Sequence, residues 1–405
     1  MKALTRFQLS SMMFLEYFIW GAWYVTMSTY MKLYLGASPV QIGAAYSALA
    51  IATMISPFFV GMVADKYFSA QRVMSVLHIL GAAILFLATK IESSNVFYWI
   101  ILIYSLLYMP TIALSNTIAF HQLTDAGKQF PTIRVFGTVG WIVSGIVLSY
   151  FKIENTATTF ILAGGASLLL GAMSYFLPHT PPQNTSKEKT TFAKAAGLDA
   201  LVLLKDKSYF IFFIAAVLIC IPLAFYYELA NLFLNDKGME NASSKMILGQ
   251  ISEALFILAI PLLFHRIGVK KMLMLGMFAW VLRYVCFSFG DMQSNTWMLY
   301  AGIILHGICY DFFFVTGYMY TEAKAGEKIK NAAQGMFTFA TYGLGMFIGT
   351  WLSGIIAHAL ITADGQYNWT PIWLVPSGVA LLVIIYFILF FKEKHSNTIQ
   401  NPQNS

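Results

Sequence analysis

The sequence predicts an all-α membrane protein with twelve transmembrane helices arranged as two six-helix bundles. Of its 405 residues, 58% are hydrophobic and only 11% are charged, whereas a soluble protein of this size carries about 25% charged residues. The apolar residues also occur in runs of roughly 18 to 25, long enough for a helix to cross about 30 Å of hydrocarbon. The third observation is that Lys and Arg gather in alternate loops.

Twelve apolar stretches account for most of the chain. The first follows a short basic start and has no small-residue cleavage site, so we expect it to remain as a helix and not to be removed as a signal peptide. The predicted spans cover residues 8–31, 38–63, 73–90, 96–120, 131–151, 158–178, 209–234, 243–264, 272–290, 296–321, 332–358 and 370–391.

The basic residues predict the orientation of these spans. If both termini lie on one side, that side holds 18 of the 25 Lys and Arg residues and the other side holds five, while Arg134 and Arg283 fall inside spans. The positive-inside rule then places both termini in the cytoplasm, and we expect a bacterial inner membrane. The net charge of +7 therefore reflects topology. It does not indicate a nucleic-acid partner, because the basic residues are scattered over short loops.

A polar stretch divides the chain in the middle. Residues 179–208 begin Pro-rich and then show an amphipathic pattern from Phe192 to Leu204, which predicts a cytoplasmic linker with a helix along the membrane surface. The predicted organisation is an N-terminal bundle (1–178), this linker (179–208), a C-terminal bundle (209–392) and a polar cytoplasmic tail (393–405).

The two halves resemble each other at equivalent places. GMVADKYFSAQR (61–72) follows the second span and FHRIGVKK (264–271) follows the eighth, while GTVGWIVSG (137–145) and GLGMFIGTWLSG (343–354) place small residues in spans five and eleven. Two repeats around a midplane site are typical of secondary transporters. The first turn resembles the signature of the major facilitator superfamily at Gly61, Asp65, Lys66 and Arg72, with Phe68 where a second Gly is usual.

Several longer blocks are similar to the nucleoside:proton symporter family of that superfamily. They are YMPTIALSNTIAF (108–120), FPTIRVFGTVGWI (130–142), GLDALVLLKDK (197–207), QISEALFILAIP (250–261) and HGICYDFFFVTGY (306–318). The resemblance implies the major facilitator fold and proton-coupled import of nucleosides by alternating access. It also implies protons as the coupling ion and no other cofactor or metal. We expect a monomer in the lipid bilayer.

Charged residues inside spans are rare and are functional candidates. Glu253 lies about ten residues from each end of span eight, near the midplane. An ionised carboxylate there costs about 2.5–3.5 kcal/mol, so a nearby cation decides whether the group is charged or takes up a proton. We therefore predict that Glu253 is a proton-coupling and substrate-binding residue; the alternative is a permanently paired structural carboxylate.

Further candidates for substrate binding come from four spans. Gln250 lies one helical turn before Glu253, and its amide suits a nucleobase edge or ribose hydroxyls. Arg134, Thr138 and Trp141 form one stripe on span five, and the resemblance places Arg134 and Thr138 in the cavity. Their alternatives are structural: an interhelical hydrogen bond for Gln250 and a cytoplasmic gate for Arg134. The remaining candidates are Tyr227 and Asn231 in span seven and Tyr310 in span ten.

Asp311 directly follows Tyr310, so the two side chains point about 100° apart on a helix. Tyr310 shares a face with His306, and we expect Asp311 to turn toward Arg283 as a buried ion pair. The resemblance links Asp311 to transport, which makes it the second candidate for proton coupling. Structural pairing alone is the alternative.

Other polar groups admit simpler interpretations. Glu16 belongs to an aromatic band on span one that either stacks on a base or packs helices. We expect Glu228 to pair with Lys237 or Lys245, and His78 to be structural.

The rival functions are a carrier of the same fold for another hydroxylated solute, such as a sugar or nucleoside derivative, and a membrane-embedded enzyme or channel. The sequence contains no H-E-x-x-H or P-loop motif, and its three cysteines lack metal-ligand spacing.

Overall fold

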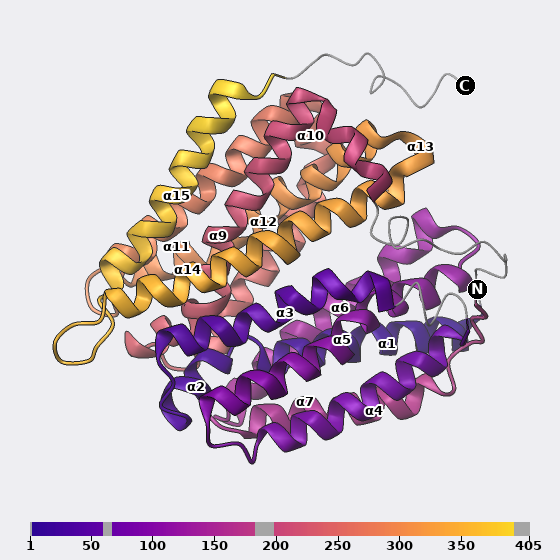
Figure 1. Ribbon diagram of the computed structural model, residues 1–405, viewed down its shortest axis with the longest axis horizontal. Coiled ribbons are helices and arrows are strands. Elements are labelled where there is room, and N and C mark those ends of the chain that lie inside the picture. The colour runs from indigo at the N-terminus through magenta and orange to yellow at the C-terminus, as the bar shows by residue number, and fades with distance from the viewer. Residues whose placement is uncertain (1, 60–66, 183–197, 393–405) are drawn as a thin grey trace.

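The structure, a computed structural model, describes residues 2–59, 67–182 and 198–392 as two helical bundles lying side by side (Figure 1). The N-terminal bundle contains α1 (Ala3–Trp23), α2 (Met27–Tyr34), α3 (Pro39–Phe59), α4 (Ala70–Ala88), α5 (Ser94–Gln122), α6 (Ala126–Tyr150) and α7 (Thr158–Ser174). The C-terminal bundle contains α9 (Lys207–Asp236), α10 (Ala242–Phe289), α11 (Thr296–Ile304), α12 (His306–Tyr310), α13 (Thr316–Thr338), α14 (Met346–Ala359) and α15 (Trp369–Phe390).

Each of the twelve predicted spans contains helix within the described residues, which leave out 60–63 of the second span. Ten segments of the described chain are long and apolar enough to cross a membrane. The first predicted span is divided into α1 and α2 by a short turn, and the sixth is the 17-residue helix α7. Spans eight and nine are joined by a kink at Gly268 (φ 75°), and spans ten and eleven are joined by a kink at Gly326 (φ 64°). Both glycines adopt the left-handed backbone conformation that other residues disfavour.

Two stretches of π-helix interrupt the regular structure of the C-terminal bundle. They are η3 (Asp311–Val315), between α12 and α13, and η4 (Phe339–Gly345), between α13 and α14. π-Helical turns are rare and frequently lie at functional sites. Here they place Tyr310 and Tyr342 within reach of each other, and the two hydroxyl groups are hydrogen-bonded.

The linker is only partly within the described residues. Of the predicted amphipathic segment, Leu198–Lys205 forms a 3₁₀ helix, η2, with Ala200 and Leu203 packed into the core of the C-terminal bundle. The earlier part of that segment lies outside the described residues. So do residues 61–66 of the superfamily signature and the tail, 393–405.

Asp206 connects the linker to the C-terminal bundle. Its Oδ1 accepts hydrogen bonds from the backbone N–H groups of Ser208 (2.8 Å) and Tyr209 (3.0 Å), which caps α9, and its Oδ2 lies 2.9 Å from Lys324 Nζ on α13. Partial burial opposes ionisation of Asp206, but the hydrogen bonds from Lys324 and the backbone outweigh it and hold the pKa of the carboxyl below its usual value.

The two bundles meet tightly at the end away from the chain termini, where α3 lies beside α14 (Figure 1). A Cβ added at Gly43 would lie 2.4 Å from the Thr350 carbonyl oxygen, so these helices approach backbone to backbone. Thr29 Oγ1 donates to Asn231 Oδ1 at 2.8 Å, and the backbone N–H of Ser243 donates to Glu154 at 2.9 Å. We refer to these contacts between α3 and α14, Thr29 and Asn231, and Glu154 and Ser243 as the closed end.

Candidate substrate and proton site

A narrow cavity lies between the two bundles, next to the closed end. Trp141 on α6 reaches it from the N-terminal bundle, while Tyr227 on α9 and Gln250 on α10 reach it from the C-terminal bundle. Its free volume is about 30 Å³, which is about the share of one water molecule in the liquid. Three of the predicted substrate residues therefore converge on one space.

Aromatic rings form the walls around this space. The Trp20 and Trp141 rings meet edge to face with centroids 5.7 Å apart, and the ring of Tyr24, which directly follows α1, lies 5.6 Å from the Tyr227 ring of the other bundle. Flat apolar faces of this kind suit stacking on a planar ring. The cavity thus joins aromatic surface from both halves with the amide of Gln250.

Arg134 adds a cation on the N-terminal side. Its guanidinium carbon lies 4.0 Å from the centre of the Tyr17 ring, a cation–π arrangement. It also interacts electrostatically with the Glu253 carboxyl across the bundle interface. Thr138, one turn further along α6, is half-buried. Arg134 thus has an aromatic platform in its own bundle and interacts at longer range with a carboxyl group of the other bundle.

Glu253 lies on α10 one turn beyond Gln250 and keeps 24% of its side chain exposed. Its Oε2 is 3.8 Å from His306 Nε2 on α12. The two helices are in backbone contact here, because a Cβ at Gly307 would lie 2.5 Å from the Glu253 nitrogen. Glu253 therefore lies between a guanidinium on one side and an imidazole on the other.

Asp311 does not form the ion pair predicted with Arg283. Arg283 Nη1 is instead 3.0 Å from His306 Nδ1, and neither carboxyl oxygen of Asp311 has a hydrogen-bond partner. The physical reason is angular: residues five apart on a helix point about 140° apart, so an Arg283 that faces His306 cannot also face Asp311. Asp311 is 1% exposed and interacts electrostatically with Glu253.

Asn231 belongs to the closed end. Asn231 is buried, accepts from Thr29 and donates to Ser243 Oγ at 3.1 Å, so its amide is engaged in closure in this conformation. The expected pairing of Glu228 is wrong, since its carboxyl is fully buried beside Ser353 and Lys237 lies over the Phe233 ring. Tyr310, in contrast, has its ring 5.6 Å from His306, beside the Glu253 site.

The sequence matches the nucleoside H⁺ symporter family over residues 2–396. The chain belongs to this family. It is 40% identical to a putative nucleoside transporter, YegT, of Escherichia coli K12, with 96% of this chain and 94% of the relative covered. It is 36% identical to the xanthosine permease and 35% identical to the nucleoside permease NupG of the same organism, each with 96% of both chains covered.

Solved structures agree with this membership. A crystal structure of a single-substitution mutant of the nucleoside transporter NupG superposes with a TM-score of 0.91 at 33% identity, covering 96% of this chain and all of that one. A POT family transporter at 15% identity superposes with a TM-score of 0.72 over 96% of each chain and shows the fold alone. This member of the nucleoside H⁺ symporter family is thus a multi-pass membrane transporter with the predicted major facilitator fold, and not an enzyme.

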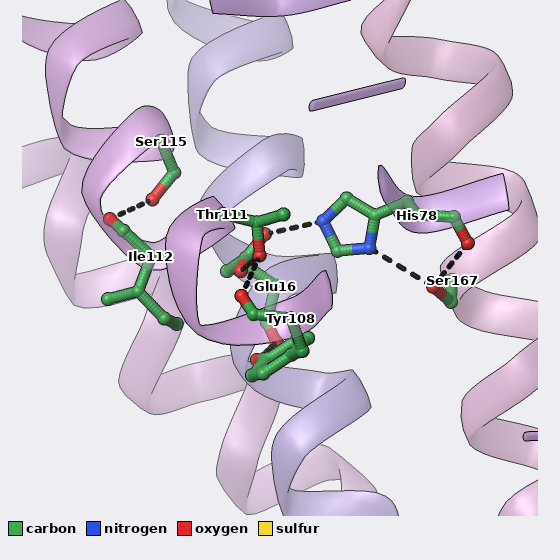
Figure 2. Close-up of polar contacts among 7 residues, drawn as sticks. All are labelled: Glu16, His78, Tyr108, Thr111, Ile112, Ser115 and Ser167. Atoms are coloured by element: carbon green, nitrogen blue, oxygen red, sulfur yellow. Dashed lines mark hydrogen bonds and ion pairs between the residues drawn. The ribbon is translucent and has the colours of Figure 1, made fainter. Parts of the chain in front are cut away.

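Within this symporter, Glu16 does not line the cavity, and its side chain points toward Thr111 and His78 of the N-terminal bundle (Figure 2). Its Oε1 accepts from Thr111 Oγ1 at 2.6 Å and its Oε2 lies 3.0 Å from His78 Nε2, while His78 Nδ1 lies 3.0 Å from Ser167 Oγ. Both Glu16 and His78 are fully buried. Glu16 is therefore paired with His78 and does not face a substrate.

Some residues of the site carried little or no sequence signal. The sequence marks His306 only as a neighbour of Tyr310 on one helix face, yet His306 contacts both Arg283 and Glu253. Tyr17 and Tyr226, which support the two arginines, look like ordinary span aromatics. Each of these tyrosines contacts its arginine from a different helix, so residue spacing along one helix does not reveal the contact.

Proposed function

We propose that this protein imports nucleosides together with protons across a bacterial inner membrane, with both termini in the cytoplasm. The observation that carries the proposal is that Trp141, Tyr227 and the Gln250 amide line one space between the bundles, while the Glu253 carboxylate lies one helical turn from Gln250 and interacts electrostatically with Arg134. The names of the relatives, a xanthosine permease among them, support nucleosides as the substrate class. The basic residues on the side of the termini support the orientation.

The residues divide the binding task by their chemistry. The base stacks between aromatic rings such as Trp141 and Tyr227, and Gln250 offers a donor and an acceptor to its edge or to the ribose. Arg134 and Thr138 contribute further donors from α6, and the Tyr310 hydroxyl on α12, which is hydrogen-bonded to Tyr342 in this conformation, becomes available when that contact opens. Asn231 becomes free to bind only when the closed end opens, because its amide is otherwise held by Thr29.

Two carboxylates can carry the coupling proton, and their surroundings differ. Asp311 is buried and forms no ion pair with Arg283, and an unpaired charge there costs several kcal/mol. Glu253 is partly exposed and has Arg134 and His306 beside it, so it can exist in either form. Because like charges at close range disfavour each other, the charge on one carboxylate opposes ionisation of the other. We propose Glu253 as the residue that exchanges the proton.

The proton gradient is large enough for this task. One elementary charge crossing 100 mV provides about 2.3 kcal/mol, and about 1.4 kcal/mol corresponds to a tenfold concentration ratio. One proton can therefore concentrate a neutral nucleoside more than tenfold. Alternating access requires the closed end to open and the opposite end to close during the cycle.

Uptake into proteoliposomes tests the proposal. A panel of nucleosides is offered with and without a pH gradient, and free ribose is the competitor that would reveal a sugar carrier. Glu253→Gln should lose accumulation driven by the gradient yet retain exchange of substrate, which needs no net proton movement. If Asp311→Asn shows that pattern and Glu253→Gln only weakens binding, the proton site is Asp311. Unchanged pH dependence in both variants would refute both assignments.

Binding measurements test the substrate residues separately. Arg134→Ala and Gln250→Ala should each weaken nucleoside binding by about 1–3 kcal/mol, the range for a lost buried hydrogen-bond partner. Gln293→Ala, in the exposed turn after α10, is the matched control and should bind like the parent. Parental affinity in both cavity variants would contradict the assignment.

A further inference from the structure

Arg283 is a buried cation whose neighbours are unusual. It is fully buried, and its guanidinium carbon lies 3.4 Å from the centre of the Tyr226 ring. Nη1 bonds to His306 Nδ1 at 3.0 Å, and the Tyr226 and Cys309 side chains are the other polar neighbours of the guanidinium. A buried guanidinium is costly unless it is compensated, and the path to a carboxylate leads through His306 to Glu253.

The contact with Arg283 determines where His306 carries its proton. A guanidinium has only donors, so the Nδ1 atom that faces Arg283 must accept. The neutral imidazole then carries its hydrogen on Nε2. If Nδ1 also carried a proton, its N–H would point at an N–H of Arg283, and the imidazolium would place a second positive charge beside the guanidinium. The geometry therefore selects the neutral Nε2–H tautomer.

The Nε2–H group of His306 faces Glu253. Nε2 is buried and lacks a hydrogen-bond partner, and it lies 3.8 Å from Glu253 Oε2. A shift of about 1 Å by the Glu253 side chain brings the two atoms to normal hydrogen-bond distance. The backbone of α12 is already held against α10 at this place, because the Gly307 N–H donates to Ser252 Oγ at 2.9 Å. A side-chain movement of Glu253 alone is therefore enough. The other titratable groups that interact with Glu253 are Arg134, Tyr226, Tyr227, Tyr310 and Asp311.

We propose that Arg283 and His306 form a positioning pair that presents an N–H donor to the Glu253 carboxylate when Glu253 releases its proton. The inference rests on the proposed function, in which Glu253 exchanges that proton. A hydrogen bond to the charged form stabilises it, so the pair sets the pH at which Glu253 loads and unloads. The proton leaves Glu253 to water, and His306 keeps its own hydrogen on Nε2. Arg283 acts through His306 and does not touch the proton.

The pH profile of nucleoside uptake into proteoliposomes tests this role. His306→Leu removes the donor, which favours the protonated carboxyl, so the midpoint of the profile should move to higher pH by about one to two units. His306→Gln restores an N–H near the position of Nε2 and should move it by less than half as much. His358→Leu, at an exposed position on α14, is the matched control and should match the parent.

A double-mutant cycle separates the positioning role from a merely structural one. Arg283→Gln removes the contact that selects the Nε2–H tautomer of His306. The midpoint of the pH profile should therefore move in the same direction as in His306→Leu. If Arg283 acts through His306, the double variant should show no further shift. Additive shifts, or a parental midpoint in His306→Leu, would overturn the proposal. If His306→Leu does not fold, an unchanged midpoint in Arg283→Gln overturns it.

Failure of the proposed function gives a different result. If the parent protein itself shows no nucleoside accumulation driven by a pH gradient, the coupling assignment is wrong before any variant is compared. If the parent accumulates nucleoside and each variant exchanges it at the parental rate with the parental pH midpoint, only the positioning pair is refuted.

Discussion

Replacing His78 with Leu should destabilise the N-terminal bundle strongly, because it removes one partner of a buried acid–base pair. The Ser167 hydroxyl donates to the His78 carbonyl oxygen at 2.9 Å, so Ser167 Oγ must accept from His78 Nδ1. One further proton is then shared between His78 Nε2 and Glu16 Oε2, 3.0 Å apart (Figure 2). Glu16 and His78 are therefore each other's polar partner in the buried interior of the bundle.

The magnitude follows from what remains after the change. In His78→Leu, Glu16 keeps Thr111 as a donor but loses the group that shares its proton, and breaking a buried pair in this way costs about 3–5 kcal/mol. Replacing both residues with Leu removes both desolvation penalties, so the double variant should be clearly more stable than the single one.

Denaturant titration in detergent micelles measures these free energies of unfolding. His121→Leu, at an exposed position near the end of α5, is the control and should change stability by less than about 0.5 kcal/mol. A loss below about 1 kcal/mol in His78→Leu, or a double variant less stable than the single one, would refute the argument. Either result would mean that Glu16 does not depend on His78 as its buried polar partner.

Three further predictions address other parts of the molecule. In a background without native cysteines, Asp364→Cys should react with an impermeant thiol reagent on intact cells, whereas Asp199→Cys should react only after permeabilisation; the reverse would contradict the topology. Gly43→Ala places a Cβ 2.4 Å from a backbone oxygen, so overpacking of about 1–3 kcal/mol should disfavour closure and slow uptake, while Gly335→Ala, which meets open space, should not. The pKa of Asp206 is lowered in the folded state. The stability that its carboxylate contributes is therefore present above the unfolded-state pKa of about 3.9 and is lost as pH falls through the folded-state pKa. The difference in melting temperature between the parent and Asp206→Asn should vanish in acid.

The sequence predicts what depends on a single helix and misses what depends on how helices are rotated against each other. Apolar run length located every span, and the rarity of intramembrane charge singled out Arg134, Glu253 and Asp311. The predicted Asp311–Arg283 pair failed because its geometry depends on the angle at which α12 faces α10, which spacing along one helix does not contain. The predicted pairing of Glu228 with a lysine was wrong for a related reason, since the burial of Glu228 depends on how α9 packs among its neighbouring helices.

The small size of the space between Trp141, Tyr227 and Gln250 has a consequence for how affinity should be interpreted. With about 30 Å³ free, a nucleoside enters only an expanded form of the protein, and the measured dissociation constant is the intrinsic constant divided by the population of that form. Substitutions that favour the expanded form should strengthen apparent binding even if they touch no substrate atom. A tighter binder among variants at the closed end is therefore no sign of a new contact, and it can be a slower transporter.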